Sequence, residues 1–168
     1  MFFSGLNQQP VGTDGDLPGT YRLGAWHHSG TFEHVVTAAP LSGNHGYYAS
    51  IDQLLWKEPG SDDAPQGLGM FIQYGWSPSD RNTVDRYFGS GVTYRGPLRN
   101  RDADLIGVGI ASADFSDPLL FSENALELFY KAQINDWMVI QPDTQYIENP
   151  SGNGKEAWVA GLRTEIVF

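Results

Sequence analysis

The chain has 168 residues, a formal net charge of −10 and no cysteine. The acidic balance argues against nucleic acid as a partner, because binding phosphate needs an excess of Lys and Arg. The lack of Cys excludes disulfides and thiolate metal sites. The 20 Gly, 10 Pro, 5 Trp, 8 Tyr and 9 Phe favour strands and turns over helices.

No apolar run approaches the ~20 residues of a transmembrane helix, so this chain would have to contact a membrane through strands. The first five residues carry neither the basic region nor the apolar region of a signal peptide. Two interpretations stay open: an intracellular protein, or the C-terminal piece of a longer precursor.

Segments of about ten residues recur along the chain, separated by clusters of Gly, Pro, Asp and Asn. Each is close to the ~9 to 11 residues with which a tilted strand crosses a bilayer. The eight predicted strands are 19–28, 46–56, 67–76, 84–95, 104–114, 124–134, 137–147 and 156–168.

The first two predicted strands flank a long connection, from His28 to His45. Alternation in 46–56 is weak, because Gln53 falls on the same face as Tyr47 and Ile51. A β-bulge or a position near the rim of the sheet would account for this residue.

The later segments alternate more strictly. In 67–76, Leu68 and Ile72 oppose Gly69 and Gln73, and in 124–134 an apolar face opposes Glu127 and other polar residues. A period of two excludes a buried helix and fits strands with lipid on one side and an aqueous lumen on the other.

The last segment ends on an aromatic residue. One face of 156–168 carries the apolar set that we expect to act as an assembly signal for barrel-assembly machinery. Its members are Phe168, Ile166, Thr164 and Leu162.

The connections predict the topology. Asn135-Asp136 is a minimal hairpin turn, whereas 115–123 and 148–155 are longer and polar. Short turns at one rim and long loops at the other are typical of a transmembrane barrel. We therefore predict an all-β chain of about eight antiparallel transmembrane β-barrel strands, with the C-terminus and the short turn in the periplasm and the His28–His45 loop outside.

An aqueous lumen that binds a polar, uncharged solute needs aromatic ring faces for C–H patches and charged or amide groups for hydroxyls. The alternative interpretation is that charged residues merely keep an aqueous pore wet. The candidates for pore lining and sugar contact are Arg22, Trp26, Asp52, Phe71, Gln73, Tyr87, Arg95, Glu127, Lys131, Asp143, Arg163 and Glu165.

Aromatic residues near the segment ends fit a different role, an interfacial girdle. They are Tyr21, Trp56, Tyr74, Trp76, Trp137 and Trp158.

No pattern in the chain supports a metal, a cofactor or a catalytic residue. The four histidines, His27, His28, His34 and His45, match no tight ligand spacing. There is no Gly-x-Ser-x-Gly elbow. The rival functions are a soluble or surface sugar-binding β-sandwich and an outer-membrane barrel enzyme.

Several stretches resemble the OprB family of carbohydrate-selective porins. They are PGTYRLGAW (18–26), DQLLW (52–56), GLGMF (67–71), DLIGVG (104–109), QPDTQYI (141–147) and AGLRT (160–164). The resemblance implies a barrel of roughly sixteen strands in the bacterial outer membrane, through which mono- or oligosaccharides diffuse passively. This chain is similar to the C-terminal half of such a barrel. We expect residues 1–168 to form one barrel segment, in which residues 1–18 are the remnant of a preceding strand and loop. The protein would be a monomer or a homo-oligomer, surrounded by outer-membrane lipid.

Overall fold

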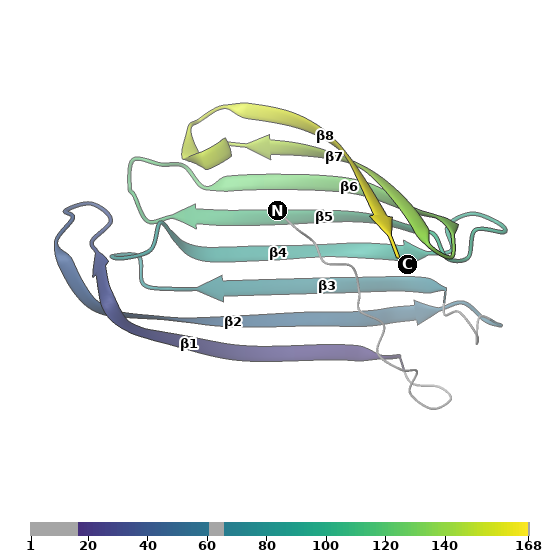
Figure 1. The fold of residues 1–168 in the computed structure, drawn as a ribbon, viewed down its shortest axis with the longest axis horizontal. Coiled ribbons are helices and arrows are strands. Elements are labelled where there is room, and N and C mark those ends of the chain that lie inside the picture. Colours follow the sequence, from purple (N-terminus) through teal and green to yellow (C-terminus); the bar gives the residue numbers. More distant parts are fainter. Residues whose placement is uncertain (1–16, 61–65, 168) are drawn as a thin grey trace.

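The computed structural model describes residues 17–60 and 66–167, which form a single antiparallel sheet (Figure 1). Each strand pairs with its neighbours in sequence order, from β1 at one edge to β8 at the other. The strands are β1 Gly19–Glu33, β2 Pro40–Lys57, β3 Gly67–Trp76, β4 Val84–Arg95, β5 Leu105–Phe115, β6 Glu123–Asn135, β7 Met138–Glu148 and β8 Glu156–Ile166, with a 3-10 turn, η1, at Pro150–Gly152.

The described strands confirm the predicted all-β class and the antiparallel order. They form one sheet, and not the two packed sheets that a β-sandwich requires. No helix among the described residues is long and apolar enough to cross a membrane.

The predicted His28–His45 loop is wrong. Pairing between β1 and β2 continues to Glu33 and Pro40, which leaves only residues 34–39 as the connection. The prediction relied on strict alternation of side chains between the two faces, and a register shift between His28 and Thr31 breaks this alternation. The backbone pairing nevertheless resumes beyond the shift.

The contrast in loop length is also weaker than predicted. One rim, here called the loop rim, carries connections 34–39, 77–83, 116–122 and 149–155; the opposite C-terminal rim carries 58–66, 96–104 and 136–137. Only the last of these is short, and its turn lies one residue later than predicted. There the Asn135 Oδ1 accepts a hydrogen bond from the Trp137 N–H at 3.1 Å.

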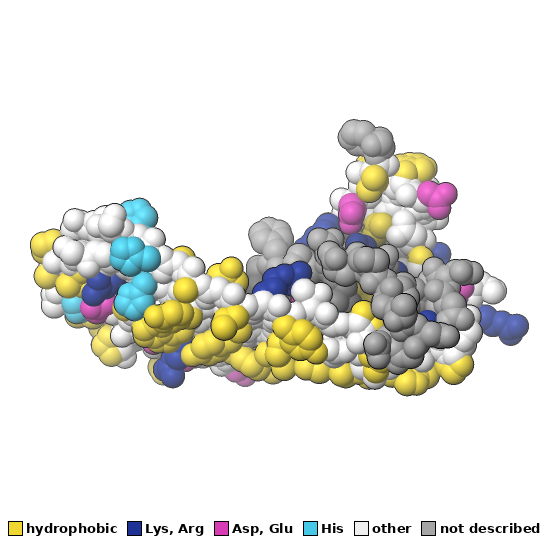
Figure 2. Space-filling model, turned by 90° about the horizontal axis from the view of Figure 1, so that it is seen from below, with side chains coloured by type: hydrophobic (Ala, Val, Ile, Leu, Met, Phe, Trp, Pro, Cys, Tyr) yellow, Lys and Arg dark blue, Asp and Glu magenta, His cyan; other side chains and the backbone are white. Residues whose placement is uncertain are grey.

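The two faces of the sheet differ in chemistry. Cross-strand rows such as Ile72, Ser90, Ile110 and Leu126 place mostly apolar side chains on the convex face, which Figure 2 shows along the underside of the molecule. These side chains stay exposed, Leu23 by 86%. An apolar surface of this extent needs an apolar solvent or a partner.

The sheet is not closed among the described residues, because β1 and β8 do not pair with each other (Figure 1). Each edge strand therefore presents a row of backbone N–H and C=O groups. In hydrocarbon such groups have to be paired, so both edges call for further strands.

The irregularity anticipated at Gln53 is a β-bulge, with a register shift between Leu54 and Trp56. The Gln53 amide donates to the carbonyl oxygens of Leu17 at 3.1 Å and Leu54 at 2.9 Å, and its Oε1 accepts from the Tyr21 hydroxyl. A polar residue on the apolar face is thus satisfied within the protein.

At the loop rim, the β3–β4 connection is bound to the β1–β2 hairpin. Arg81 Nη1 donates to the Ser42 carbonyl at 3.0 Å, and the Asn44 amide, 2% exposed, donates to Asn82 Oδ1 at 2.8 Å. Arg81 also hydrogen-bonds Asp80, which is the main reason that the pKa of Asp80 lies below its ordinary value. The connection is therefore held in place as part of the rim.

Asp104 is the most deeply buried charged side chain among the described residues, at 1% exposure. It ends the 96–104 connection and accepts hydrogen bonds from Arg101 Nε at 2.6 Å, the Gln133 N–H at 2.9 Å and the Tyr130 hydroxyl. Burial alone would raise the pKa of Asp104, but these donors outweigh it and hold the pKa below its ordinary value.

Asp104→Asn should lower the free energy of unfolding at neutral pH by about 2 kcal/mol, the cost of breaking charge-assisted hydrogen bonds to a buried group. Because the folded pKa is depressed, the contribution is present above the unfolded pKa of about 3.9 and is lost as pH falls through the folded value. The difference from wild type should therefore be similar at about pH 7 and pH 5 and shrink below about pH 4.

The measurement is the unfolding midpoint of the membrane-inserted protein in urea at several pH values. Asp102→Asn is the matched control, because Asp102 lies in the same connection and is exposed. Equal midpoints for the two variants at neutral pH would contradict the anchoring role of Asp104.

Candidate functional site: the concave wall of the sheet

The concave face has a trough of glycines along its centre. Alternate positions of β4 and β5 carry Gly89, Gly91, Gly107 and Gly109, and the register places Gly91 directly opposite Gly109. Large polar and aromatic side chains stand on both sides of this trough, on β1 to β3 and on β6 to β8. The central wall is therefore thin, and side chains of neighbouring positions lie over it, so that Gly89, Gly107 and Gly109 are buried.

Aromatic residues on this face are paired with glycines across the strands. Phe71 lies opposite Gly91, and a Cβ at Gly91 would fall 2.5 Å from the Phe71 ring. Phe129 lies over Gly107 in the same way, also at 2.5 Å. The far end of each ring therefore lies over the backbone of the neighbouring strand, where a side chain would otherwise begin.

The same arrangement recurs at the loop-rim end of the first hairpin. Trp26 covers Gly46 and Tyr48 covers Gly24, where an added Cβ would lie 2.6 Å and 2.2 Å from the rings. Four ring platforms thus occur along the described part of the wall.

Charged side chains of both signs stand beside these rings. Arg22 Nη1 lies 3.0 Å from Asp52 Oδ2, across β1 and β2. On the other flank, Lys131 Nζ lies 3.3 Å from Glu165 Oε2, which brings β6 and β8 together over β7. Both pairs are partly exposed, so they contribute little to stability.

A second group of charges lies near the Phe129 platform. Glu127 is 7% exposed, and Asp143 and Arg163 are among the charges that act on it. The Asp143 carboxylate lies over Gly161, where an added Cβ would come within 2.5 Å of Oδ1. Carboxylate acceptors and a guanidinium donor are therefore within one small area of β6, β7 and β8.

The strand register puts all twelve predicted lining residues on the concave face. They fall into three groups, and their contact with sugar remains a prediction. The first group is Arg22, Trp26 and Asp52 on β1–β2; the second is Phe71, Gln73, Tyr87 and Arg95 on β3–β4; the third is Glu127, Lys131, Asp143, Arg163 and Glu165 on β6–β8.

Sequence reasoning missed two ring platforms, Tyr48 and Phe129. Both residues stand at alternate strand positions that belong to the concave face, and the sequence shows this alternation. Their position over Gly24 and Gly107 depends on the register, which the sequence does not show. An inward aromatic residue with glycine at the same height of the next strand is the signal that would have found them.

The six predicted girdle aromatics lie on the convex face or at its rims. Trp158 is 75% exposed and Tyr21 67%, and the Trp56 and Tyr94 rings are stacked at 6.4 Å between centroids. Exposed amphipathic rings at the strand ends are typical of a membrane–water interface.

The residues predicted as an assembly signal lie on β8 and beyond. Leu162 and Ile166 are exposed on the convex face, by 72% and 54%, and Thr164 pairs with Ile140 on the same face. Phe168 lies outside the described residues, and the assembly role of the set stays a prediction.

Two of the four histidines form local hydrogen bonds with the backbone. His28 Nδ1 accepts a hydrogen bond from the Gly30 N–H at 3.0 Å, and His34 Nδ1 accepts one from the Val36 N–H at 3.1 Å. Within residues 17–60 and 66–167, no three His, Asp or Glu side chains are grouped so that they could hold a metal ion.

One antiparallel sheet with an exposed apolar convex face, aromatic rims and a polar, glycine-rich concave face is the wall of a transmembrane β-barrel of the porin class. The chain belongs to the OprB family of carbohydrate-selective porins, whose family model matches residues 1–168. Family membership implies a location in the bacterial outer membrane.

Two curated relatives are porins. The chain is 31% identical to Porin B of Pseudomonas aeruginosa in an alignment 200 residues long, gaps included. The alignment covers 96% of this chain and 43% of the relative. It is 26% identical to the putative porin QuiX of Acinetobacter baylyi, covering 90% and 41%. The chain therefore spans less than half the length of these relatives.

The fold matches solved structures of Pseudomonas putida OprB. The high-pH structure superposes with a TM-score of 0.81 at 26% identity, over 89% of this chain and 44% of that chain. The low-pH structure, at 24% identity, shares the fold with a TM-score of 0.59 over 88% of this chain and 46% of that chain.

Gly107→Ala should lower channel conductance. The new methyl group would meet the Phe129 ring at 2.5 Å, so the ring has to move off the wall and into the lumen. Gly75→Ala is the matched control on the same face, because its Cβ would meet no atom closer than 3.8 Å.

Single-channel conductance in planar bilayers checks this prediction. We expect a smaller conductance for Gly107→Ala and an unchanged one for Gly75→Ala. Equal conductances in two variants that both insert would show that the ring does not border the ion path.

Proposed function

We propose that this chain forms part of the wall of an outer-membrane channel through which neutral sugars diffuse passively. The observation that carries the proposal is the concave face of a chain in the carbohydrate-selective porin family, where ring platforms stand beside side chains of both charges. Ring faces take up the C–H patches of a sugar, and charged or amide groups bind its hydroxyls.

The balance of charge favours neutral solutes. The twelve lining residues include four cations, Arg22, Arg95, Lys131 and Arg163, and four carboxylates, Asp52, Glu127, Asp143 and Glu165. Opposite charges held at 3.0 Å and 3.3 Å attract no net counter-ion, yet their remaining donors and acceptors can exchange water for hydroxyl groups. Several weak contacts along a wall let a sugar enter and also leave.

The width of the channel follows from strand number. Eight strands close into a barrel whose interior side chains fill, whereas roughly sixteen to eighteen leave an aqueous channel. The chain spans less than half the length of the porins that it matches, which supports the wider barrel. We infer that the described sheet is about half of a wall of roughly sixteen strands, and that strands pairing with β1 and β8 complete it.

The orientation follows that of other outer-membrane barrels. The C-terminal rim faces the periplasm and the loop rim faces outward, with the exposed side chains of Leu162 and Ile166 available to barrel-assembly machinery. Transport of this kind needs no covalent step and no cofactor. The assembled protein acts as a monomer or a homo-oligomer in outer-membrane lipid.

Replacing Arg22 or Arg163 with Ala should slow sugar flux without preventing insertion. Each variant loses hydrogen-bond donors in the lumen, and about 0.5–1 kcal/mol for one hydrogen bond corresponds to a change of about two- to fivefold. Arg99→Ala is the control, because Arg99 is an exposed residue of the 96–104 connection outside the strands.

Swelling rates of proteoliposomes in several mono- and disaccharides give the measurement. Gel migration of unheated and heated samples shows whether each variant has folded and inserted. Swelling rates for Arg22→Ala and Arg163→Ala that match those of Arg99→Ala in every sugar would remove both residues from the sugar path.

A further inference from the structure

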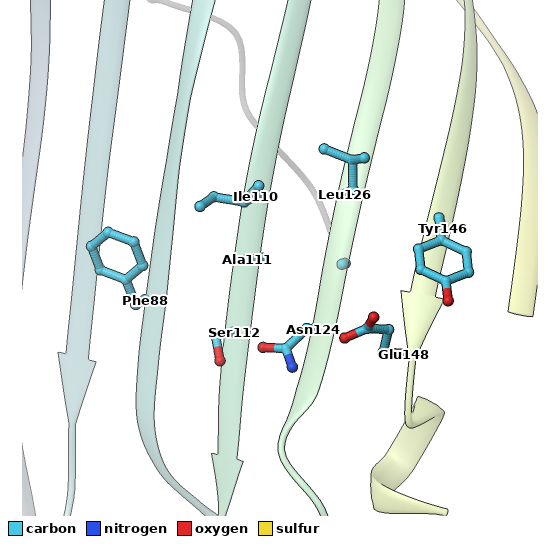
Figure 3. Close-up of a pocket in the computed structure, with 9 residues that line it drawn as sticks. Phe88, Ile110, Ala111, Ser112, Asn124, Leu126, Tyr146 and Glu148 are labelled. Atoms are coloured by element: carbon cyan, nitrogen blue, oxygen red, sulfur yellow. The ribbon is translucent and has the colours of Figure 1, made fainter. Parts of the chain in front are cut away.

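The two faces of the sheet leave different groups without partners. The convex face has a hollow of about 430 Å³ over β4 to β7, between the rings of Phe88 and Tyr146 (Figure 3). Its lining is mostly apolar, and its one charged side chain, Glu148, is exposed. This hollow therefore calls for no polar ligand. The concave face, in contrast, holds a half-buried charge that has no partner among the described residues.

That charge is Arg95, the last residue of β4. Its side chain is half-buried and forms no ion pair or hydrogen bond within residues 17–60 and 66–167. The other three cations of the lining set each have a carboxylate in their surroundings. These are the pairs Arg22–Asp52 at 3.0 Å and Lys131–Glu165 at 3.3 Å, and Arg163, whose charge acts on Glu127. Because charged groups that leave water are normally paired, Arg95 calls for an anion.

The cross-strand row that contains Arg95 carries further positive charge. Arg95 pairs with Gly67 on β3 and Leu105 on β5, and Lys57 and Lys131 stand beyond these two uncharged residues on β2 and β6. With about 4.8 Å between strands, each lysine backbone lies about 10 Å from that of Arg95, close to the Debye length at physiological salt. The carboxylates at this end of the strands already bind other groups: Glu58 accepts from the Tyr94 hydroxyl, Asp104 pairs with Arg101, and Glu165 pairs with Lys131.

A carboxylate fits this position. A guanidinium binds a carboxylate through two parallel N–H···O bonds, which a single ammonium group does not form. The attraction is stronger at a wall that is partly shielded from water, and neighbouring cations raise the concentration of anions in front of it. Because Arg95 ends β4 on the concave face, this position lies on the solute path beside the C-terminal rim.

We propose that Arg95 binds the carboxylate group of sugar acids, so that the channel takes up uronic and aldonic acids as well as neutral sugars. The inference rests on the proposed function, because it places the site on the same sugar path. It adds a class of solute. The paired charges elsewhere on the wall suit neutral sugars, whereas Arg95 offers its charge to the solute.

Fluxes of labelled glucuronate and glucose into proteoliposomes that contain the full protein test the proposal. Arg95→Gln should lower the ratio of glucuronate flux to glucose flux about tenfold, the effect of one charge-assisted interaction. Arg95→Lys keeps the charge but not the fork, so its ratio should lie between those of the wild type and Arg95→Gln. The effect of Arg95→Gln should shrink at about 1 M salt.

Arg99→Gln is the matched control, because it removes the same charge from an exposed position of the 96–104 connection and should leave the ratio unchanged. Equal ratios in Arg95→Gln and Arg99→Gln would overturn the proposal. So would an Arg95→Gln protein that no longer inserts, as judged by gel migration of unheated samples, because Arg95 would then have a carboxylate partner in the rest of the barrel. A wild type that passes glucose but excludes glucuronate would overturn this site alone, whereas one that passes neither would refute the proposed function as well.

Discussion

In hydrocarbon, every backbone N–H and C=O needs a partner within the protein, because no water is there to replace it. This constraint explains the single ladder from β1 to β8, in which each strand is bound to its sequence neighbours. It also explains why Gln53, on the apolar face, turns its amide back to backbone carbonyls at the bulge. The same requirement acts on the two open edges, which a bilayer would not tolerate without further strands.

Side-chain packing has a smaller role here than in a soluble domain. Leu105, Ala111 and Val139 are the buried hydrophobic residues of the described chain, whereas most large apolar side chains point outward. Stability therefore depends on the ladder, on lipid contact and on anchors at the rims. Asp104 is such an anchor, because one carboxylate ties the 96–104 connection to β6.

The alternation in sequence was enough to predict most strands and to assign their faces. It worked for β3 and β5, where one face is continuously apolar through Leu68–Ile72 and Ile106–Ile110, and it failed beyond His28, where a bulge shifts the phase while pairing continues. It could not predict partners. Arg22 and Asp52 are thirty residues apart, and the Lys131–Glu165 pair crosses β7, so both contacts depend on register and curvature.

Rings that lie over glycines give the lumen an unusual kind of boundary. Phe71 and Phe129 each place ring atoms where the Cβ of the opposite residue would stand, so these rings approach the neighbouring strand more closely than any residue other than glycine would allow. The glycine beneath each ring decides how far it stands off the wall. Relatives with the same number of strands can therefore differ in bore through exchanges at these glycines alone, while the rings that meet the solute stay the same.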